Sequence, residues 1–145
     1  MEADPFPIHL LGFVNPNLSI SSVFFIGLIL IALLLLSALL AGSEVAFFSL
    51  NADQRSALRE SDNPAEKAVS SLLDRPQQLL ATLLIAINFV NIIFITLSNY
   101  LTEMILGVPK DPEMALIITL FLLFGITFII TFFGELIPKV WAQQN

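Results

Sequence analysis

Three long stretches of this chain contain no Asp, Glu, Lys or Arg: Pro5–Ser43, Pro76–Thr102 and Met114–Gly134. An α-helix needs about 20 apolar residues to cross a hydrocarbon core of about 30 Å, so each stretch is long enough for one crossing. Backbone groups in lipid must be hydrogen-bonded within the segment, and the alternation that a closed barrel requires is absent. The sequence therefore predicts an all-α membrane protein with three transmembrane helices.

The composition agrees with this fold class. Hydrophobic residues make up 57% of the 145 residues and charged residues only 12%, which is too apolar for a soluble domain of this size. We place the three spans at about 22–50, 79–100 and 115–137. Cysteine is absent, which excludes disulfides and thiolate metal sites. No basic patch exists to hold phosphates, so binding to nucleic acid is not expected.

The connection between the first two spans, residues 51–75, is predicted to form a helical hairpin. Asn51 can cap a first helix that ends near Arg59, because Asn is a favoured N-cap residue. Ser61-Asp62-Asn63-Pro64 interrupts that helix, and proline suits the first turn of a second helix that ends near Asp74. The apolar residues of the hairpin favour docking against the inner membrane face, and a solvated linker is the alternative.

Positive charge is concentrated in the same connection. It holds four of the six basic residues, namely Arg55, Arg59, Lys67 and Arg75. Because Lys and Arg favour the cytoplasmic side, the sequence predicts that the hairpin and the C-terminus are cytoplasmic. The N-terminal segment, residues 1–21, is then predicted to lie outside.

Two acidic motifs interrupt the apolar sequence, and the first is Ala41-Gly42-Ser43-Glu44. A helix over residues 23–50 would be about 42 Å long at 1.5 Å per residue, which exceeds the hydrocarbon core. It must tilt strongly or break, and Gly42-Ser43 is the natural break. An opened helix would expose carbonyls and the Ser43 hydroxyl as oxygen ligands for an ion. The alternative is that Glu44 lies at the inner interface, where its charge serves an inner gate or only the interface itself.

The second acidic motif, at the end of the third span, is Gly134-Glu135-Leu136-Ile137-Pro138-Lys139. The ring of Pro138 cannot continue a regular helix, so Gly134 and Pro138 together are predicted to loosen the backbone around Glu135. Lys139 either pairs with Glu135 four residues earlier or extends to the cytoplasmic surface. A carboxylate in hydrocarbon usually faces a cavity, a partner charge or an ion path, so Glu135 is either an ion ligand or half of a structural ion pair.

The second span carries two amides, Asn88 and Asn91, which share a helix face near the membrane midplane. They could join helices through hydrogen bonds worth about 0.6–2 kcal/mol, or they could offer neutral oxygens to a cation. With Ser43 and Glu135 they form an all-oxygen set that suits hard ions such as Mg²⁺, Ca²⁺ or Na⁺. The spans hold no nucleophile–histidine arrangement and the chain no phosphate-cradling glycine loop, so no enzymatic activity is predicted.

These motifs resemble those of a known family. The segments 42–46, 88–92 and 134–139 occur in the order seen in the transmembrane domain of the CorC/cyclin-M (CNNM) magnesium transporter family. The acidic segment 1–7 further resembles the gliding-motility-associated GldE branch. The resemblance implies a homodimer in a bacterial inner membrane that exports Mg²⁺ or exchanges it for a coupling cation such as Na⁺. It also implies one Mg²⁺ site per protomer, formed by Ser43, Asn91 and Glu135, with Gly42 opening the first helix.

The chain departs from the family pattern at the start of the second-span motif. Many relatives have Gly-Asn there, whereas this chain has Ala86-Ile87, so a ligand is expected to be missing or displaced by about 100° around the helix. Family members continue into paired CBS domains, so the sequence is expected to be a truncated piece of a longer protein. Two functional hypotheses follow. One is a divalent-cation transporter domain; the other, favoured by Ile87, is a non-transporting scaffold or accessory subunit of a gliding or secretion apparatus.

Overall fold

The computed structural model describes residues 19–107 and 110–144, and every regular element in this part of the chain is a helix. The elements are α1 (Ile20–Ser49), α2 (Ala52–Glu60), α3 (Pro64–Leu73), α4 (Pro76–Leu106), α5 (Pro112–Thr131), the π-helix η2 (Phe132–Leu136) and α6 (Ile137–Gln144). Segment 1–7, which carries the resemblance to one branch of the family, lies outside the described residues. The predicted all-α fold is confirmed.

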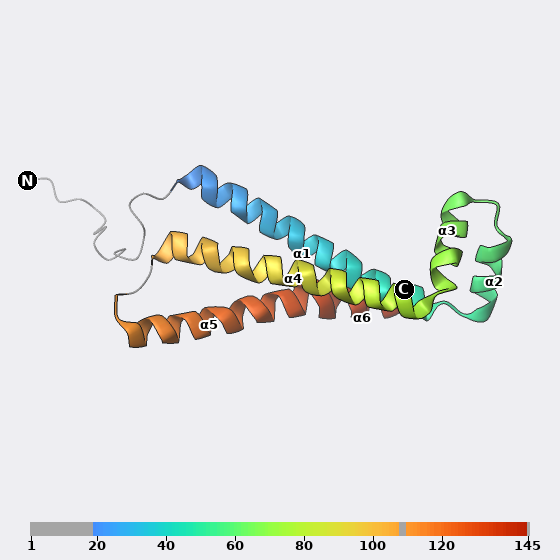
Figure 1. The fold of residues 1–145 in the computed structure, drawn as a ribbon. Helices are drawn as coiled ribbons and strands as arrows, with labels where there is room; N and C mark the ends of the chain where they lie inside the picture. The colour runs from blue at the N-terminus through green and yellow to red at the C-terminus, as the bar shows by residue number, and fades with distance from the viewer. Residues whose placement is uncertain (1–18, 108–109, 145) are drawn as a thin grey trace, which may run out of the picture.

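Three helical rods are long and apolar enough to cross a membrane: α1, α4 and the continuous rod from α5 through η2 to α6. They converge toward the hairpin end and spread apart toward the other end, and α2 and α3 form a hairpin across the end at which they converge (Figure 1). The second and third rods extend beyond the predicted spans. Their first turns begin at prolines in polar sequence, Pro76 and Pro112, and the side chain of Asp111 caps α5 by accepting from the Glu113 N–H.

The predicted hairpin is confirmed almost to the residue. The Asn51 side chain accepts from the Gln54 N–H while the Gln54 side chain accepts from the Asn51 N–H, a complete capping box. Asn63 caps α3, and Pro64 occupies its first turn. An apolar cluster joins the hairpin to the ends of α1 and α4; it consists of Leu40, Phe47, Leu50, Leu58, Val69, Leu73, Leu79 and Leu83. The hairpin is therefore docked on the bundle; its placement against a membrane face stays a prediction.

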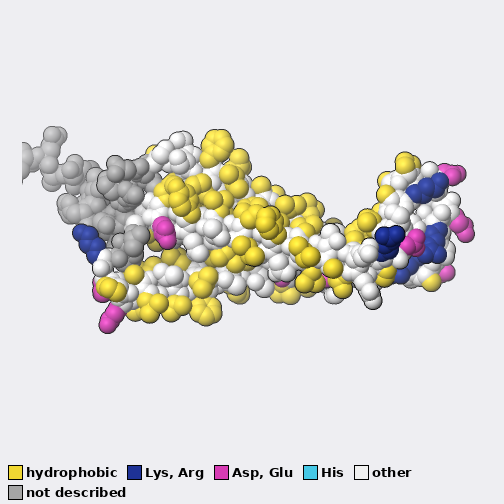
Figure 2. Space-filling view, in the orientation of Figure 1, with side chains coloured by type: hydrophobic (Ala, Val, Ile, Leu, Met, Phe, Trp, Pro, Cys, Tyr) yellow, Lys and Arg dark blue, Asp and Glu magenta, His cyan; other side chains and the backbone are white. Residues whose placement is uncertain are grey.

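Helix α4 is the central element of the bundle. About 28% of its most apolar window is buried, against 6% in α1 and 11% in the third rod. The buried residues recur every three or four positions, as one helix face requires: Leu79, Leu83, Ile87, Val90, Phe94 and Ser98. Most other apolar side chains face outward, and they cover the bundle in Figure 2. Such an exterior suits hydrocarbon rather than water.

The expected break at Gly42-Ser43 is wrong. Helix α1 is regular from Ile20 to Ser49, and the Ser43 hydroxyl donates to the Leu40 carbonyl at 2.8 Å, a bond within the helix. Glycine permits an irregular backbone without imposing one, and both peptide N–H groups remain available for the α-helical pattern. The irregular turn in the bundle is η2, in the other acidic motif.

Candidate cation site

Glu135 lies in the π-helix η2. The Ile137 N–H donates to the Phe132 carbonyl, five residues back, which widens the turn around the carboxylate. Pro138 has no N–H to offer to the Gly134 carbonyl, and its ring would clash with that carbonyl in a regular helix. The expectation that Gly134 and Pro138 loosen this backbone is confirmed. Single π-turns of this kind are frequent at functional sites.

Gly134 allows η2 to approach α1 closely. A Cβ atom at this position would lie 3.1 Å from Ser37 Oγ and 3.3 Å from Ile130 Cγ1. Ser37 and Ile130 are the largest side chains that are completely buried, so neither has free space into which to move. The absence of a side chain at residue 134 therefore sets the distance between the first and third rods at the level of Glu135.

A chain of hydrogen bonds links the three rods at this level. Ser37 Oγ of α1 donates to Asn91 Oδ1 of α4 at 2.9 Å, and Asn91 Nδ2 donates to Glu135 Oε1 of η2 at 2.5 Å. Ser37 is fully buried, whereas Asn91 and Glu135 are half-buried. We call these three residues the Ser37–Asn91–Glu135 cluster. The amide of Asn91 thus joins helices, and its oxygen and the two flanking groups are all potential cation ligands.

The cluster lies near the middle of the bundle. Asn91 is the central residue of α4, with fifteen residues of that helix on either side. A helix of this length is longer than a hydrocarbon core of about 30 Å, so its centre falls deep within the membrane if the helix spans it symmetrically. In that position the cluster would lie where water is scarcest and where an ionised group is costliest.

The charge of Glu135 is not balanced by a basic side chain within residues 19–107 and 110–144. In the same residues, no group of three or more His, Cys, Asp or Glu side chains gathers into a metal site. A cation at the cluster would thus meet one carboxylate and neutral oxygens. This donor set suits a hard cation that keeps part of its water shell.

Lys139 pairs with the other acidic motif. Its Nζ lies 2.9 Å from Glu44 Oε2, so the expected pairing of Lys139 with Glu135 is wrong, whereas its extension to the cytoplasmic surface stays a prediction. The reason is geometric: Glu135 faces Asn91 on α4, while Lys139 on α6 faces α1. The Glu44 side chain is 19% exposed and that of Lys139 38%. The pair lines a pocket of about 410 Å³ on the hairpin side of the cluster, together with Val45, Phe48, Ser49, Leu80 and Gln143.

Two of the residues expected to ligate an ion lie outside the cluster. Asn88 is exposed, and its Nδ2 donates to the Leu84 carbonyl of its own helix at 2.8 Å. Ser43 is likewise bonded within α1, and a Cβ atom at Gly42 would lie 3.9 Å from Pro138. Ile87, the departure from the family pattern, occupies the buried face of α4 that faces the bundle.

Ser37 was missed as a site residue. Its signal is a single hydroxyl in the middle of the run Leu-Leu-Leu-Leu-Ser-Ala-Leu-Leu, residues 33–40, where packing alone would favour another apolar residue. It lies six residues, nearly two helical turns, before Ser43 and therefore outside the acidic motif. Asn91 and Glu135 of the expected ligand set lie in the cluster. The serine in the cluster is Ser37, whereas Ser43 was expected.

The chain is similar to proteins of one family. The family model of the cyclin M transmembrane N-terminal domain matches residues 28–145. A UPF0053 protein of Haemophilus influenzae is 33% identical over 118 residues, which cover 81% of this chain and 26% of that protein. The chain thus spans about a quarter of the length of this curated relative. No solved structure matches it.

Proposed function

Because the chain belongs to the cyclin M transmembrane domain family, whose members include divalent-cation transporters, we propose that it carries Mg²⁺ across the membrane. The observation that carries the proposal is the Ser37–Asn91–Glu135 cluster. It offers one carboxylate and two neutral oxygens at the centre of the bundle, and no other charged side chain among the described residues neutralises the carboxylate. A cation is the natural partner of such a group.

The proposed ligand set binds a cation without trapping it. Mg²⁺ loses its water shell reluctantly and is usually held by one or two carboxylates with water completing the shell. Glu135 supplies the single charge and Asn91 a carbonyl oxygen, while Ser37 holds the amide of Asn91 in place. Transport requires a site that an ion enters and also leaves, and one carboxylate with neutral partners meets this need better than an acidic cage.

The amide of Asn91 responds to the ion in this proposal. Without a cation, Asn91 Nδ2 donates to Glu135 and Asn91 Oδ1 accepts from Ser37. A cation beside Glu135 repels the N–H group, and a half-turn of the carboxamide presents Oδ1 to the ion. Nδ2 then faces Ser37 Oγ, which can accept because a hydroxyl both donates and accepts. Ser37 thus stabilises both orientations of the amide.

The Glu44–Lys139 pair is the proposed gate on the hairpin side. An ion that moves between the cluster and the hairpin end passes the pocket that this pair lines. Lys139 holds the Glu44 carboxylate until an arriving cation competes for it. We further propose that the domain acts as a homodimer in a bacterial inner membrane, with the hairpin in the cytoplasm, and that it exports Mg²⁺ or exchanges it for a cation such as Na⁺.

Mg²⁺ flux in liposomes that contain the reconstituted protein tests this proposal. Asn91→Ala, Ser37→Ala and Glu135→Gln are each expected to lower the flux at least tenfold, with Glu135→Gln the most severe. Asn88→Ala and Ser43→Ala are matched controls, because they remove the same side chains outside the cluster, and they are expected to retain the flux.

The control variants also define the contrary result. If the cluster variants keep their flux while Ser43→Ala or Asn88→Ala loses it, the ion is bound elsewhere and the cluster serves only to join helices. If the unmodified protein shows neither Mg²⁺ flux nor a Mg²⁺-dependent thermal shift and is isolated with a partner protein, the scaffold hypothesis replaces transport.

A further inference from the structure

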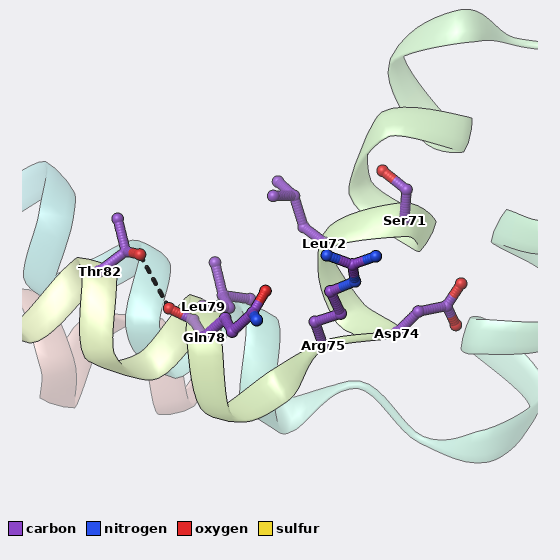
Figure 3. Close-up of a pocket in the computed structure, with 7 residues that line it drawn as sticks. All are labelled: Ser71, Leu72, Asp74, Arg75, Gln78, Leu79 and Thr82. Carbon is purple, nitrogen blue, oxygen red and sulfur yellow. Dashed lines mark hydrogen bonds between the residues drawn. The ribbon is translucent and has the colours of Figure 1, made fainter.

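A pocket of about 690 Å³ opens at the corner where α3 ends and α4 begins (Figure 3). It is lined by Ser71, Leu72, Asp74, Arg75, Gln78, Leu79 and Thr82. The pocket is separate from the cation site, because Asn91 follows Gln78 by thirteen positions, which correspond to about 20 Å along the helix. Nothing in the proposed transport function uses it.

Arg75 gives this pocket a positive charge. Its guanidinium forms no ion pair with the other residues that the structure describes. The neighbouring carboxylate of Asp74 points away from Arg75 in Figure 3 and is engaged instead by Arg59 of α2. The one acidic side chain in the pocket lining is therefore already paired, and the guanidinium remains available to an anion.

The remaining polar lining fits the same kind of ligand. Arg75 is the N-cap residue of α4, no side chain caps this helix end, and Pro76 follows in the first turn. The N–H groups of Gln77 and Gln78 therefore lie at the positive end of a 31-residue helix, beside the guanidinium. The Gln78 amide adds a further donor to the lining. The hydroxyls of Ser71 and Thr82 also line the pocket, but they donate to the Ala68 and Gln78 carbonyls of their own helices. A phosphate group matches the guanidinium, the amide and the N–H groups at the helix end.

The apolar residues at this corner indicate the source of the phosphate. Leu72 and Leu79 line the pocket, and Leu72 is 48% exposed. The polar first turns of α4 lead at once into its apolar span, so the pocket lies at the boundary between headgroups and hydrocarbon. A phospholipid uses both parts of this surface, whereas a free phosphate uses only the polar part.

We propose that the corner pocket around Arg75 binds the phosphate of an anionic phospholipid headgroup. A bound lipid joins α3 to α4 and holds the hairpin at the membrane surface. The hairpin as a whole is no polybasic patch, since residues 51–75 carry five acidic against four basic side chains. The attraction is therefore local to Arg75, in keeping with basic pockets that hold lipid headgroups at the cytoplasmic ends of transmembrane helices.

Native mass spectrometry of the protein in detergent micelles, titrated with dioleoylphosphatidylglycerol, tests the proposal. Dioleoylphosphatidylcholine is the matched lipid without net charge, and glycerol 3-phosphate is the free phosphate. We expect phosphatidylglycerol to bind best and Arg75→Gln to lower its affinity about fivefold, the effect of one cation near an anionic surface. Arg75→Lys is expected to retain most of the preference.

Two charge controls separate this pocket from general electrostatics. Lys67→Gln removes a hairpin charge that pairs with Asp62, and Lys110→Gln removes a charge from the opposite end of the bundle. Both are expected to leave the lipid preference unchanged. If Arg75→Gln does not fold, Gln78→Leu, which removes a lining amide without altering the turn, carries the same test.

Three results would overturn the proposal. Equal affinity for the two lipids removes the need for an anionic headgroup, and an equal loss in either lysine control removes the role of Arg75. Binding of glycerol 3-phosphate as tight as that of the lipid assigns the pocket to a free phosphate compound. None of these results depends on which ion the Ser37–Asn91–Glu135 cluster carries.

Discussion

The two acidic motifs of this protein have similar sequences and different structures. Each contains a glycine one or two residues before a glutamate at the end of an apolar span. The first motif remains a regular α-helix through Gly42 and Glu44, whereas the second forms the π-helix η2 around Glu135. The difference is Pro138, which removes a backbone donor that no packing can restore. A glycine permits an irregular helical turn, whereas a proline inside a helix prevents a regular one.

The two carboxylates also differ in their surroundings. Glu44 is paired with Lys139, whereas Glu135 meets the amide of Asn91 and no basic side chain among the described residues. The charge of Glu44 is thus balanced by a lysine, whereas no basic side chain among the described residues balances the charge of Glu135. A cation binds more readily where it need not first displace a lysine, which favours Glu135 as the ligand.

The two glycines give the largest expected contrast. Gly134→Ala is expected to cost about 1 kcal/mol or more, because its Cβ would press on the buried Ser37 and Ile130. Gly42→Ala is expected to be neutral or to stabilise by up to about 1 kcal/mol, because its Cβ meets nothing closer than 3.9 Å and alanine favours a helix. Thermal unfolding in detergent measures both: the Tm should fall in Gly134→Ala and stay the same or rise in Gly42→Ala.

A second variant checks the cause of the Gly134 effect. Ser37→Ala removes the Oγ atom that lies 3.1 Å from the new Cβ, so it should recover part of the Tm lost in Gly134→Ala. Equal Tm values for the two glycine variants would mean that η2 and α1 are not closely packed in the folded protein.

The proline that separates the two motifs can be removed. Pro138→Ala restores a backbone donor for the Gly134 carbonyl and makes a regular helix possible, which turns Glu135 relative to Asn91. We expect the apparent affinity for Mg²⁺ in a thermal-shift titration to fall about tenfold, equivalent to about 1.4 kcal/mol, without a decrease in the Tm of the ion-free protein.

Pro112→Ala is the control for this variant. Pro112 lies in the first turn of α5, where its missing N–H has no helical partner to lose, so its replacement should leave Mg²⁺ affinity unchanged. An unaltered affinity in Pro138→Ala would show that the π-helix is not needed to orient the carboxylate.

The smallest expected effect concerns the paired carboxylate. A double-mutant cycle of Glu44→Gln and Lys139→Gln is expected to give a coupling of about 1 kcal/mol or less, because the Lys139 side chain is 38% exposed. Exchange of the two charges, Glu44→Lys with Lys139→Glu, should recover part of the loss of either single charge reversal. The more exposed pair of Asp62 and Lys67, 3.6 Å apart, serves as a reference cycle with no measurable coupling. Strictly additive effects at residues 44 and 139 would exclude a gate held by this pair.

The parts of the fold that depend on local chemistry could be predicted from the sequence. The hairpin boundaries follow from Asn51, Asn63 and Pro64, because capping and proline geometry involve residues within one turn. The three spans follow from the absence of charge over long apolar stretches. The irregular backbone around Glu135 follows from Pro138. In each case the deciding atoms are neighbours in the sequence.

The site required information that the sequence does not carry. Whether Asn88 or Asn91 faces a partner depends on how α4 is rotated in the bundle, and the buried stripe that contains Ile87 and Val90 decides this. Likewise, Lys139 could pair with Glu135, four residues earlier in the sequence, or with Glu44 of α1. Only the packing of α6 on α1 decides for Glu44.

By itself, the sequence determined a membrane protein of three helices, a capped hairpin and a carboxylate beside a proline. These outcomes rest on hydrocarbon solvation and on backbone donors, which each segment satisfies alone. Only the tertiary structure decided that Ser37 rather than Ser43 meets Asn91 and Glu135. That outcome depends on helix rotation and on the close approach at Gly134, which are set by side-chain packing between residues more than forty positions apart.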